Sequence, residues 1–423
     1  METLVTVITT ALVTVLVGIF AVNFVTSEKR LARRPRRLYG IEKADFTRAL
    51  GVLLGPAVLA GNRIDTLVNG RQIFPAMLAA IDGARKTITF ETFIYWADPV
   101  GQAFKEALCT AAQRGVKVHV LIDWVGGRNL DRGLHATLLD AGVEVQLYHP
   151  LNWYHLHRMN NRTHRKLLVI DGRVGFTGGV GIARIWSGDA EDEEHWRDTH
   201  YRVEGPVVAQ MQAAFLDNWM KSTGHVLHGE DYFPELSPLG SSRAQMFTSS
   251  AQQGADSMQL MVALALGAAS REIWIQNAYF VPDELTTEGL VDAAQRGVKV
   301  RIMVPGAVTD ADVVRRASQA SWGRLMAAGI EIFEYQPTML HCKVMVVDGQ
   351  WCSLGSANFD TRSFRVNDEA NLNVWDEQFA AQQLALMHDD LKRCERYDYG
   401  RWRRRPLQRR IIERAAGMLR SQL

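Results

Sequence analysis

The chain has 423 residues, of which 47% are apolar and 22% are charged, which excludes wholesale disorder and predicts two or more folded domains. Its net charge of +2 does not favour a nucleic-acid-binding protein. Its four cysteines form no CxxC pair, which argues against a disulfide framework and a zinc ribbon and fits a reducing compartment.

The first predicted element is a helix over residues 4–25, which carry no charged side chain. Such a helix is about 33 Å long, enough for a hydrocarbon layer of about 30 Å. A basic block follows it directly: Lys29, Arg30, Arg33, Arg34, Arg36 and Arg37. This charge bias predicts a single transmembrane helix with the rest of the chain on the cytoplasmic side. A cleaved signal peptide and a buried core helix are the alternatives, but no basic residue precedes the apolar run.

The remainder of the chain contains an internal repeat. The octapeptide AAQRGVKV occurs at residues 111–118 and again at 293–300, and LLDAGVEVQLYHP (138–150) is echoed by LMAAGIEIFEYQP (325–337). Each copy predicts a helix followed by a strand with few polar residues, which is typical of a sheet covered on both faces. The sequence therefore predicts a duplicated α/β unit, whose halves are related by a pseudo-twofold axis with a site between them.

A segment rich in Pro, Ser and Gly near residues 235–245 is the predicted junction between the halves. We expect four regions: a membrane anchor with its basic segment (1–43), a first α/β domain (44–238), a second α/β domain (239–400) and a basic tail (401–423).

The strongest signal is a motif that occurs once in each half, H-x-K-x4-D-G, with a constant offset. The first copy is HRKLLVIDG, with His164, Lys166 and Asp171, and the second is HCKVMVVDG, with His341, Lys343 and Asp348. Both copies are predicted to lie on strands, where a His and a Lys two residues apart point to the same face.

Paired histidines and lysines at one interface suit phosphodiester chemistry. One imidazole can attack phosphorus while the other protonates the leaving oxygen. The two ammonium groups can neutralise charge that builds on the phosphate oxygens, so a metal ion is not required.

Each motif has a polar or glycine-rich continuation. Ser356 and Asn358 follow the second copy and can donate hydrogen bonds to a phosphate, whereas glycines occupy the equivalent stretch of the first. A reacting imidazole also needs an orienting carboxylate. The candidates are Asp198 and Glu369, each placed before a strand-like run, with a solvated loop acid as the alternative for both.

These motifs resemble those of the phospholipase D superfamily, and GSANFDTRSF, NAYFVPDE and WRDTHYRVEGP more narrowly resemble its bacterial cardiolipin synthase branch. The resemblance implies two tandem α-β-α sandwich domains and one composite site. It implies His164 as nucleophile and His341 as general acid and base. It also implies phosphate binding by Lys166, Lys343, Ser356 and Asn358, orientation of the histidines by Asp198 and Glu369, and structural roles for Asp171 and Asp348. The family's first-half Asn falls at Gly181, so that half lacks an amide donor.

The resemblance further implies transfer of a phosphatidyl group between two phosphatidylglycerol molecules, which gives cardiolipin and glycerol through a phosphatidyl-histidine intermediate. The alternatives are hydrolysis of phospholipid to phosphatidic acid, a nucleic-acid phosphodiesterase, and a membrane-bound binding module without activity. The expected partners are phospholipid and a bilayer rather than nucleic acid, with no cofactor. The expected location is the bacterial inner membrane, with the catalytic part in the cytoplasm.

Two weaker signals remain. The basic tail is predicted to lie on anionic lipid with Ile411, Ile412, Met418 and Leu419 inserted, with a solvated or disordered end as the alternative. A zinc site in the cluster of His149, His155, His157 and His164 is disfavoured because a third or fourth ligand at a recognisable spacing is absent.

Overall fold

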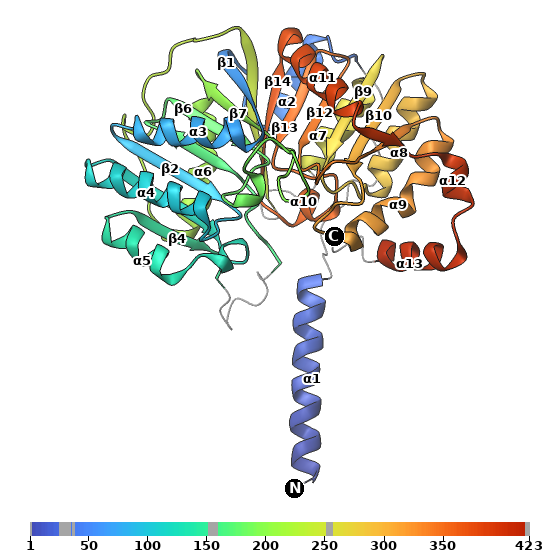
Figure 1. Ribbon diagram of the computed structural model, residues 1–423, viewed down its shortest axis with the longest axis horizontal. Coiled ribbons are helices and arrows are strands. Elements are labelled where there is room, and N and C mark those ends of the chain that lie inside the picture. Colours follow the sequence, from blue (N-terminus) through green and yellow to red (C-terminus); the bar gives the residue numbers. More distant parts are fainter. Residues whose placement is uncertain (1, 25–34, 36–38, 151–159, 251–256, 419–423) are drawn as a thin grey trace.

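The computed structural model describes residues 2–24, 35, 39–150, 160–250 and 257–418. Its first helix, α1 (Glu2–Phe24), projects away from the rest of the molecule, and residues 2–18 are exposed (Figure 1). Among the helices in these ranges, none is both long and apolar enough to cross a membrane. The predicted amino-terminal helix is present, but its predicted passage through a bilayer is not confirmed. Residue 25 and the predicted basic block lie outside the described residues.

The first half of the chain alternates strands and helices. Its elements are α2 (Ala44–Leu53), β1 (Leu59–Val68), α3 (Asn69–Asp82), β2 (Thr87–Thr92), α4 (Pro99–Gln113), β3 (Lys117–Asp123), η1 (Gly126–Asn129), α5 (Arg132–Asp140), β4 (Glu144–Tyr148), β5 (Leu167–Ile170), β6 (Val174–Gly178), η3 (Arg184–Trp186), β7 (Thr199–Glu204) and α6 (Val208–Thr223).

The second half repeats this order and adds elements at its end. They are β8 (Ser242–Ser249), α7 (Ser257–Ala268), β9 (Glu272–Asn277), α8 (Glu284–Gln295), β10 (Lys299–Pro305), α9 (Asp312–Ala327), β11 (Glu331–Tyr335), β12 (Lys343–Val347), β13 (Trp351–Gly355), α10 (Thr361–Arg365), β14 (Glu369–Trp375), α11 (Glu377–Leu391), β15 (Cys394–Arg396), α12 (Tyr399–Arg403) and α13 (Leu407–Met418).

The described strands form one mixed sheet in the order β15-β11-β10-β9-β12-β13-β14-β8-β1-β7-β6-β5-β2-β3-β4. Apart from β15, the order reads the same from either edge when each strand is replaced by its counterpart in the other half. The antiparallel pair β8 and β1 joins the halves at the centre, and each half has a parallel outer part (Figure 1). The predicted α/β class and the internal duplication are therefore confirmed.

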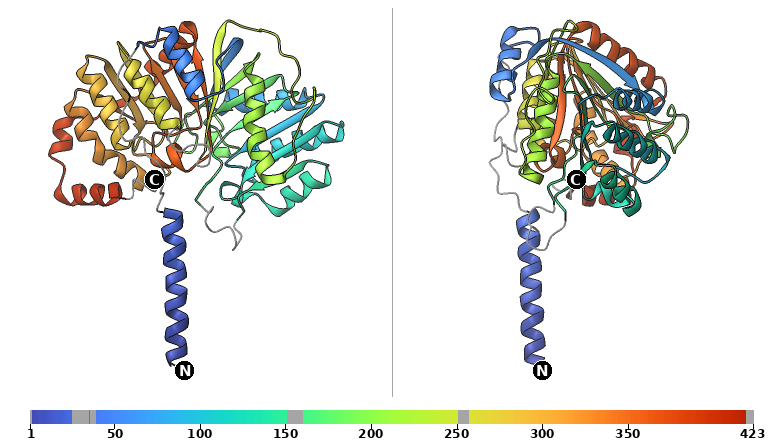
Figure 2. Two further views of the ribbon diagram at one scale, coloured as in Figure 1. Left: turned by 180° about the vertical axis from the view of Figure 1, so that it is seen from behind. Right: turned by 90° about the vertical axis from the view of Figure 1, so that its left-hand side faces the viewer.

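Helices pack on both faces of this sheet (Figure 2). Along β2, Ile88 and Phe90 join the buried cluster under α3 and α4, whereas the Thr89 hydroxyl donates to Gln212 of α6 on the other face. Along β9, Ile273 and Trp274 likewise belong to clusters on opposite faces. This two-sided burial explains why these strands have few polar interruptions.

The motif residues lie slightly differently from the prediction. His164 and Lys166 precede β5, His341 precedes β12, and Lys343 is the first residue of β12. The histidines are therefore in the segments that lead into the strands and not in the strands themselves.

Helix α2 belongs to the core of the second half. Phe46 and Leu50 are fully buried in the cluster that contains α7 and α8, and the ring of Phe46 meets that of Trp351 edge-on at 5.8 Å. Residues 44–53 therefore precede the first half in sequence but pack on the second half. The predicted first domain, which begins at residue 44, includes this helix.

Candidate active site

The two motif histidines meet where the halves join. The backbone N–H of His164 donates to the carbonyl of Asp368 at 2.9 Å, and that of His341 donates to the carbonyl of Arg197 at 2.7 Å. Asp368 immediately precedes Glu369, and Arg197 immediately precedes Asp198. Each histidine is therefore hydrogen-bonded to the segment that carries the orienting acid of the other half.

The side chains pair crosswise in the same way. Nδ1 of His164 lies 3.1 and 3.0 Å from the two carboxylate oxygens of Glu369, and Nδ1 of His341 lies 2.7 Å from Oδ2 of Asp198. Because a carboxylate can only accept, Nδ1 donates in both pairs. In the neutral imidazole Nε2 then carries no proton, and its free lone pair can act as a nucleophile.

Burial controls the protonation of both pairs. It lowers the pKa of His164, and the neighbouring lysines lower it further against the pull of Glu369. It also lowers the pKa of His341, with Lys343 acting in the same direction. Burial opposes ionisation of Glu369, but the His164 contact and Lys166 together hold the pKa of this carboxyl below its ordinary value. These surroundings therefore favour neutral histidines beside an ionised Glu369.

Asp198 has a different balance. Burial raises its pKa to about 6, and the positive charge of Lys343 and the backbone N–H of Thr199 only partly offset this effect. The acid in contact with His341 thus has a higher pKa than the acid in contact with His164.

Both motif lysines are buried beside the histidines. Lys166 Nζ donates to the carbonyl of His164 at 2.7 Å, and Lys343 Nζ donates to the carbonyl of His341 at 2.6 Å. Burial lowers the pKa of both, to about 7 for Lys166. An anionic phosphodiester between them would restore their full charge, as charge pairing in a low-dielectric site requires.

The predicted phosphate donors have mixed geometry. The Ser356 hydroxyl donates to Glu369 Oε2 at 2.5 Å and accepts from the backbone N–H of Ala370 at 3.0 Å, so it supports the acid directly. Asn358 is buried, and its side-chain oxygen has no hydrogen-bond partner in the described structure. The single O–H of Ser356 is therefore already donated to Glu369, and the unpartnered atom of Asn358 is an acceptor, so only the amide nitrogen of Asn358 could donate to a phosphate oxygen.

The two motif aspartates lie at the far ends of their strands from the histidines. Asp171 accepts from the backbone N–H groups of residues 85–87, and Asp348 accepts from those of residues 270–272. Each acid therefore ties its motif strand to the start of the neighbouring strand, and this geometry supports the structural role implied for both.

Gly181 is explained by Trp186. A Cβ added at Gly181 would lie 2.9 Å from Cβ of Ile94 and 3.0 Å from the Trp186 ring, closer than packed carbon atoms approach. The Trp186 indole N–H donates to Asp198 Oδ2 at 3.1 Å. The first half thus has an indole against its acid, next to the position where the second half carries the amide of Asn358.

Sequence reasoning missed the aromatic lining of the site. Trp186, Trp196 and Tyr279 place their ring centroids 5.2, 5.3 and 6.5 Å from the His341 ring, and Phe93 lies 5.4 Å from that of His164. Two of these residues lie inside the segments that carry the resemblance, since Trp196 begins WRDTHYRVEGP and Tyr279 lies in NAYFVPDE, but nothing in those segments indicated a contact with His341.

No group of three or more potential metal ligands occurs among the described residues. Of the histidines considered for zinc, His155 and His157 lie outside those residues, and Nδ1 of His149 lies 3.2 Å from the carbonyl oxygen of Asn161.

Comparison with known proteins places the chain. The family model "Cardiolipin synthase, PLD-like domain" matches residues 77–219 and 262–391. Cardiolipin synthase A of Pseudomonas putida strain GB-1 is 35% identical over 350 residues, which cover 82% of this chain and 72% of that protein. Cardiolipin synthase of Geobacillus sp. strain WCH70 is 35% identical over 356 residues, covering 84% and 71%.

Among solved structures, phosphatidylserine synthase of Haemophilus influenzae Rd KW20 matches with a TM-score of 0.71 at 15% identity, over 90% of this chain and 100% of that one. At this identity the likeness shows the fold alone. The matches in sequence, in both repeats and over most of the chain, show that this chain is an enzyme of the phospholipase D superfamily and belongs to its bacterial cardiolipin synthase family.

Proposed function

We propose that the enzyme transfers a phosphatidyl group from one phosphatidylglycerol to another, forming cardiolipin and releasing glycerol. The observation that carries the proposal is the pair of crossed histidine–carboxylate contacts, flanked by two buried lysines, at the junction of the halves. The names of the matched relatives supply the substrate class.

In the first step Nε2 of His164 attacks phosphorus, and the bond from phosphorus to the glycerol headgroup oxygen breaks. His341 gives its proton to that oxygen, and glycerol leaves. Bound phosphodiester adds negative charge beside His341, which raises its pKa and favours the protonated form that this step needs. Glu369 stabilises the positive charge that develops on His164.

In the second step a hydroxyl of another phosphatidylglycerol attacks phosphorus, and the bond between phosphorus and His164 breaks. His341 takes the proton of the attacking hydroxyl, so both histidines return to their starting state. One phosphodiester replaces another, and no external energy source enters the balance. Lys166, Lys343 and Asn358 are proposed to hold the phosphate oxygens in both steps.

The test uses purified protein with phosphatidylglycerol in mixed micelles, with chelator present and products identified by mass spectrometry. We expect cardiolipin and glycerol from the parent and neither from His164→Ala or His341→Ala. Phosphatidic acid in place of cardiolipin would assign the enzyme as a hydrolase with the same site, and turnover of a nucleotide diester but no lipid would refute the lipid assignment.

The covalent step has its own test. Acid-quenched enzyme should carry an added phosphatidyl mass on the peptide that contains His164, and a His164→Asn variant should carry none. The same adduct on the peptide of His341 would reverse the assignment of the two histidines.

We also propose that residues 4–25 hold the enzyme at a bacterial inner membrane with the catalytic part in the cytoplasm. The uncharged run, the basic residues after it and a lipid substrate support this proposal. Protease added to intact spheroplasts should leave the catalytic part whole, and protease added to inverted vesicles should cleave it. The opposite pattern would place the site outside the cytoplasm.

A further inference from the structure

Helix α13 carries an exposed band of apolar side chains and arginines. Leu407 and Ile411, one turn apart, are 69% and 59% exposed. Arg410 and Arg414, also one turn apart, are exposed, and within the described residues neither side chain has an ionic or hydrogen-bonding partner. Large apolar side chains beside cations on the outward face of one helix are the pattern of helices that lie at a membrane surface.

The opposite face fixes the orientation of this band. Glu413 is 1% exposed and forms ion pairs with Arg405 at 2.5 Å and Arg409 at 3.1 Å. Ala416 packs with Val281 and Ala317 in a buried cluster. The helix is therefore docked on the second half, and its apolar band points away from the protein.

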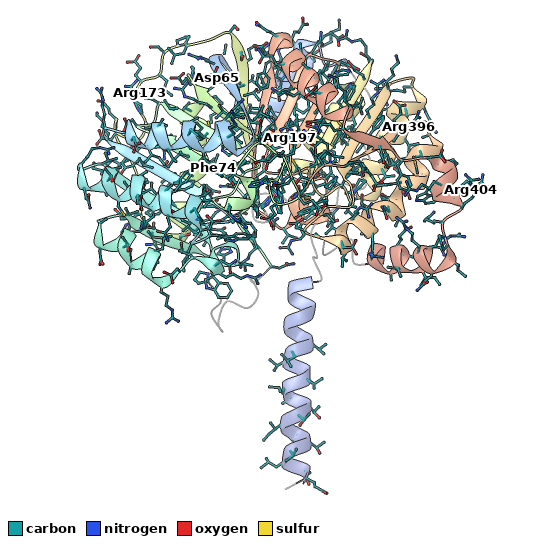
Figure 3. All side chains as sticks on the ribbon, viewed as in Figure 1. Asp65, Phe74, Arg173, Arg197, Arg396 and Arg404 are labelled. Carbon is teal, nitrogen blue, oxygen red and sulfur yellow. The ribbon has the colours of Figure 1, made fainter. Side chains whose placement is uncertain are left out.

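The preceding helix strengthens the attachment. The indole N–H of Trp402 in α12 donates to the carbonyl of Gln319 in α9 at 2.8 Å, and the side chain of Arg409 donates to the amide oxygen of Gln319 at 3.0 Å. Helix α13 lies at the end of the molecule from which α1 projects and runs across the direction of α1 (Figures 1 and 2). Figure 3 places Arg404, between α12 and α13, at the edge of this region.

We propose that the outward face of α13 docks on an anionic lipid bilayer. Leu407 and Ile411 would enter the boundary between headgroups and acyl chains, and Arg410 and Arg414 would meet the lipid phosphates, as in interfacial amphipathic helices. A nucleic acid offers no apolar layer for the two aliphatic side chains. A second copy of the same face would bring like-charged arginines together, so an anionic bilayer fits this face better than either.

The docking proposal does not depend on the catalytic assignment, and its test reads contact rather than turnover. In full-length protein, Ile411→Cys is labelled with an environment-sensitive fluorophore in a Cys394→Ser background. The other three cysteines, Cys109, Cys342 and Cys352, are buried. The protein is mixed with vesicles of phosphatidylcholine alone or with added phosphatidylglycerol.

We expect blue-shifted emission, and quenching by spin-labelled acyl chains, with the anionic vesicles only. Val52→Cys is the matched control because this side chain is 83% exposed on α2, at the end of the molecule opposite α1, and should show no shift (Figure 1). Arg410→Gln with Arg414→Gln should remove most of the shift at position 411.

Three outcomes would overturn the proposal. An unchanged spectrum with anionic vesicles means that the face does not meet lipid. An equal shift with neutral vesicles removes the role of the arginines. A shift that appears without lipid and grows with protein concentration assigns the face to self-association instead.

Discussion

The two histidines of the site are supported by acids that differ in length and in environment. Asp198 directly precedes β7, and Glu369 is the first residue of the equivalent strand β14. Glu369 accepts from the Ser356 hydroxyl, whereas Asp198 accepts from the Trp186 indole N–H. The pKa of Asp198 is raised and that of Glu369 is lowered. This difference suits the roles proposed for the two histidines. The proposed nucleophile, His164, needs a carboxylate that stays ionised, whereas the proposed proton carrier, His341, needs a partner whose pKa is nearer neutral pH.

The crossed pairing leads to a prediction about individual imidazoles. In Glu369→Gln the loss of the carboxylate should lower the pKa of His164 further and leave that of His341 unchanged, and kcat should fall about 10²–10⁴-fold. NMR of labelled histidine, assigned with His341→Asn, measures both pKa values. A shift confined to His341 would contradict the pairing.

The pH dependence of kcat/KM should follow Asp198 and Lys166. As the pH falls through about 6, Asp198 takes a proton and no longer stabilises a positive His341. As the pH rises through about 7, Lys166 loses its charge, so phosphate binding weakens. We expect a bell-shaped profile in mixed micelles. Lys166→Arg should move only the alkaline limb to higher pH, because a guanidinium stays charged; an unmoved limb would rule out Lys166.

Trp186 should act on Asp198 through its N–H. Trp186→Phe keeps an aromatic ring but removes this donor, so the pKa of Asp198 should rise. The acid limb of the kcat/KM profile should then move to higher pH. Trp196→Phe is the control because Trp196 packs on the same imidazole and, within the described residues, its indole N–H makes no hydrogen bond to Asp198. An identical acid limb in both Phe variants would leave Trp186 as packing only.

Gly181→Asn should displace Trp186 and cost about 1–3 kcal/mol of stability.

Among the elements, helix α2 is the one whose place could not be read from local pattern. Its apolar positions predict an amphipathic helix, but nothing in residues 44–53 indicates which half they cover. The limits proposed for the domains, 44–238 and 239–400, remain a prediction. Because α2 packs on the second of these domains, we expect the stabilities of the two domains to be coupled.

Phe46→Ala should therefore destabilise the second half. Removing a fully buried ring that contacts Trp351 should cost about 3–5 kcal/mol, read from urea unfolding followed by tryptophan fluorescence. Val52→Ala, on the exposed side of the same helix, should change stability little. Equal losses in the two variants would contradict the packing role, because alanine raises helix propensity at both positions and only lost contacts can destabilise.

At the scale of the whole molecule, a buried ion pair joins the halves beside the site. Arg197, which lies near the middle of the molecule, makes two contacts with Asp390 of α11, at 3.0 and 2.9 Å (Figure 3). Its guanidinium also donates to the carbonyl of Asp198 at 2.8 Å. The position of one orienting acid in the first half thus depends on a helix of the second.

Breaking this pair on one side should be costly. Asp390→Asn leaves a buried guanidinium without its counter-charge and should lower the free energy of unfolding by about 3–5 kcal/mol. The double variant Arg197→Met with Asp390→Leu should regain much of this stability in thermal unfolding but not the activity, because Asp198 still loses its support. Recovery of full activity would show that Arg197 has no positioning role.

The sequence by itself determined the repeat and the α/β class, and it nominated the candidate site residues, because these are properties of local order: periodicity, motif spacing and residue type. His164, Lys166, His341, Lys343, Asp198 and Glu369 were all predicted, and the structure brings them together at one junction.

The tertiary structure decided which acid serves which histidine, what fills the space beside Gly181 and where α2 packs. The paired atoms belong to residues 205 and 143 positions apart, and they meet only because β8 and β1 join the halves in one relative orientation. That orientation depends on long-range burial across the sheet, which no pattern along a single segment encodes.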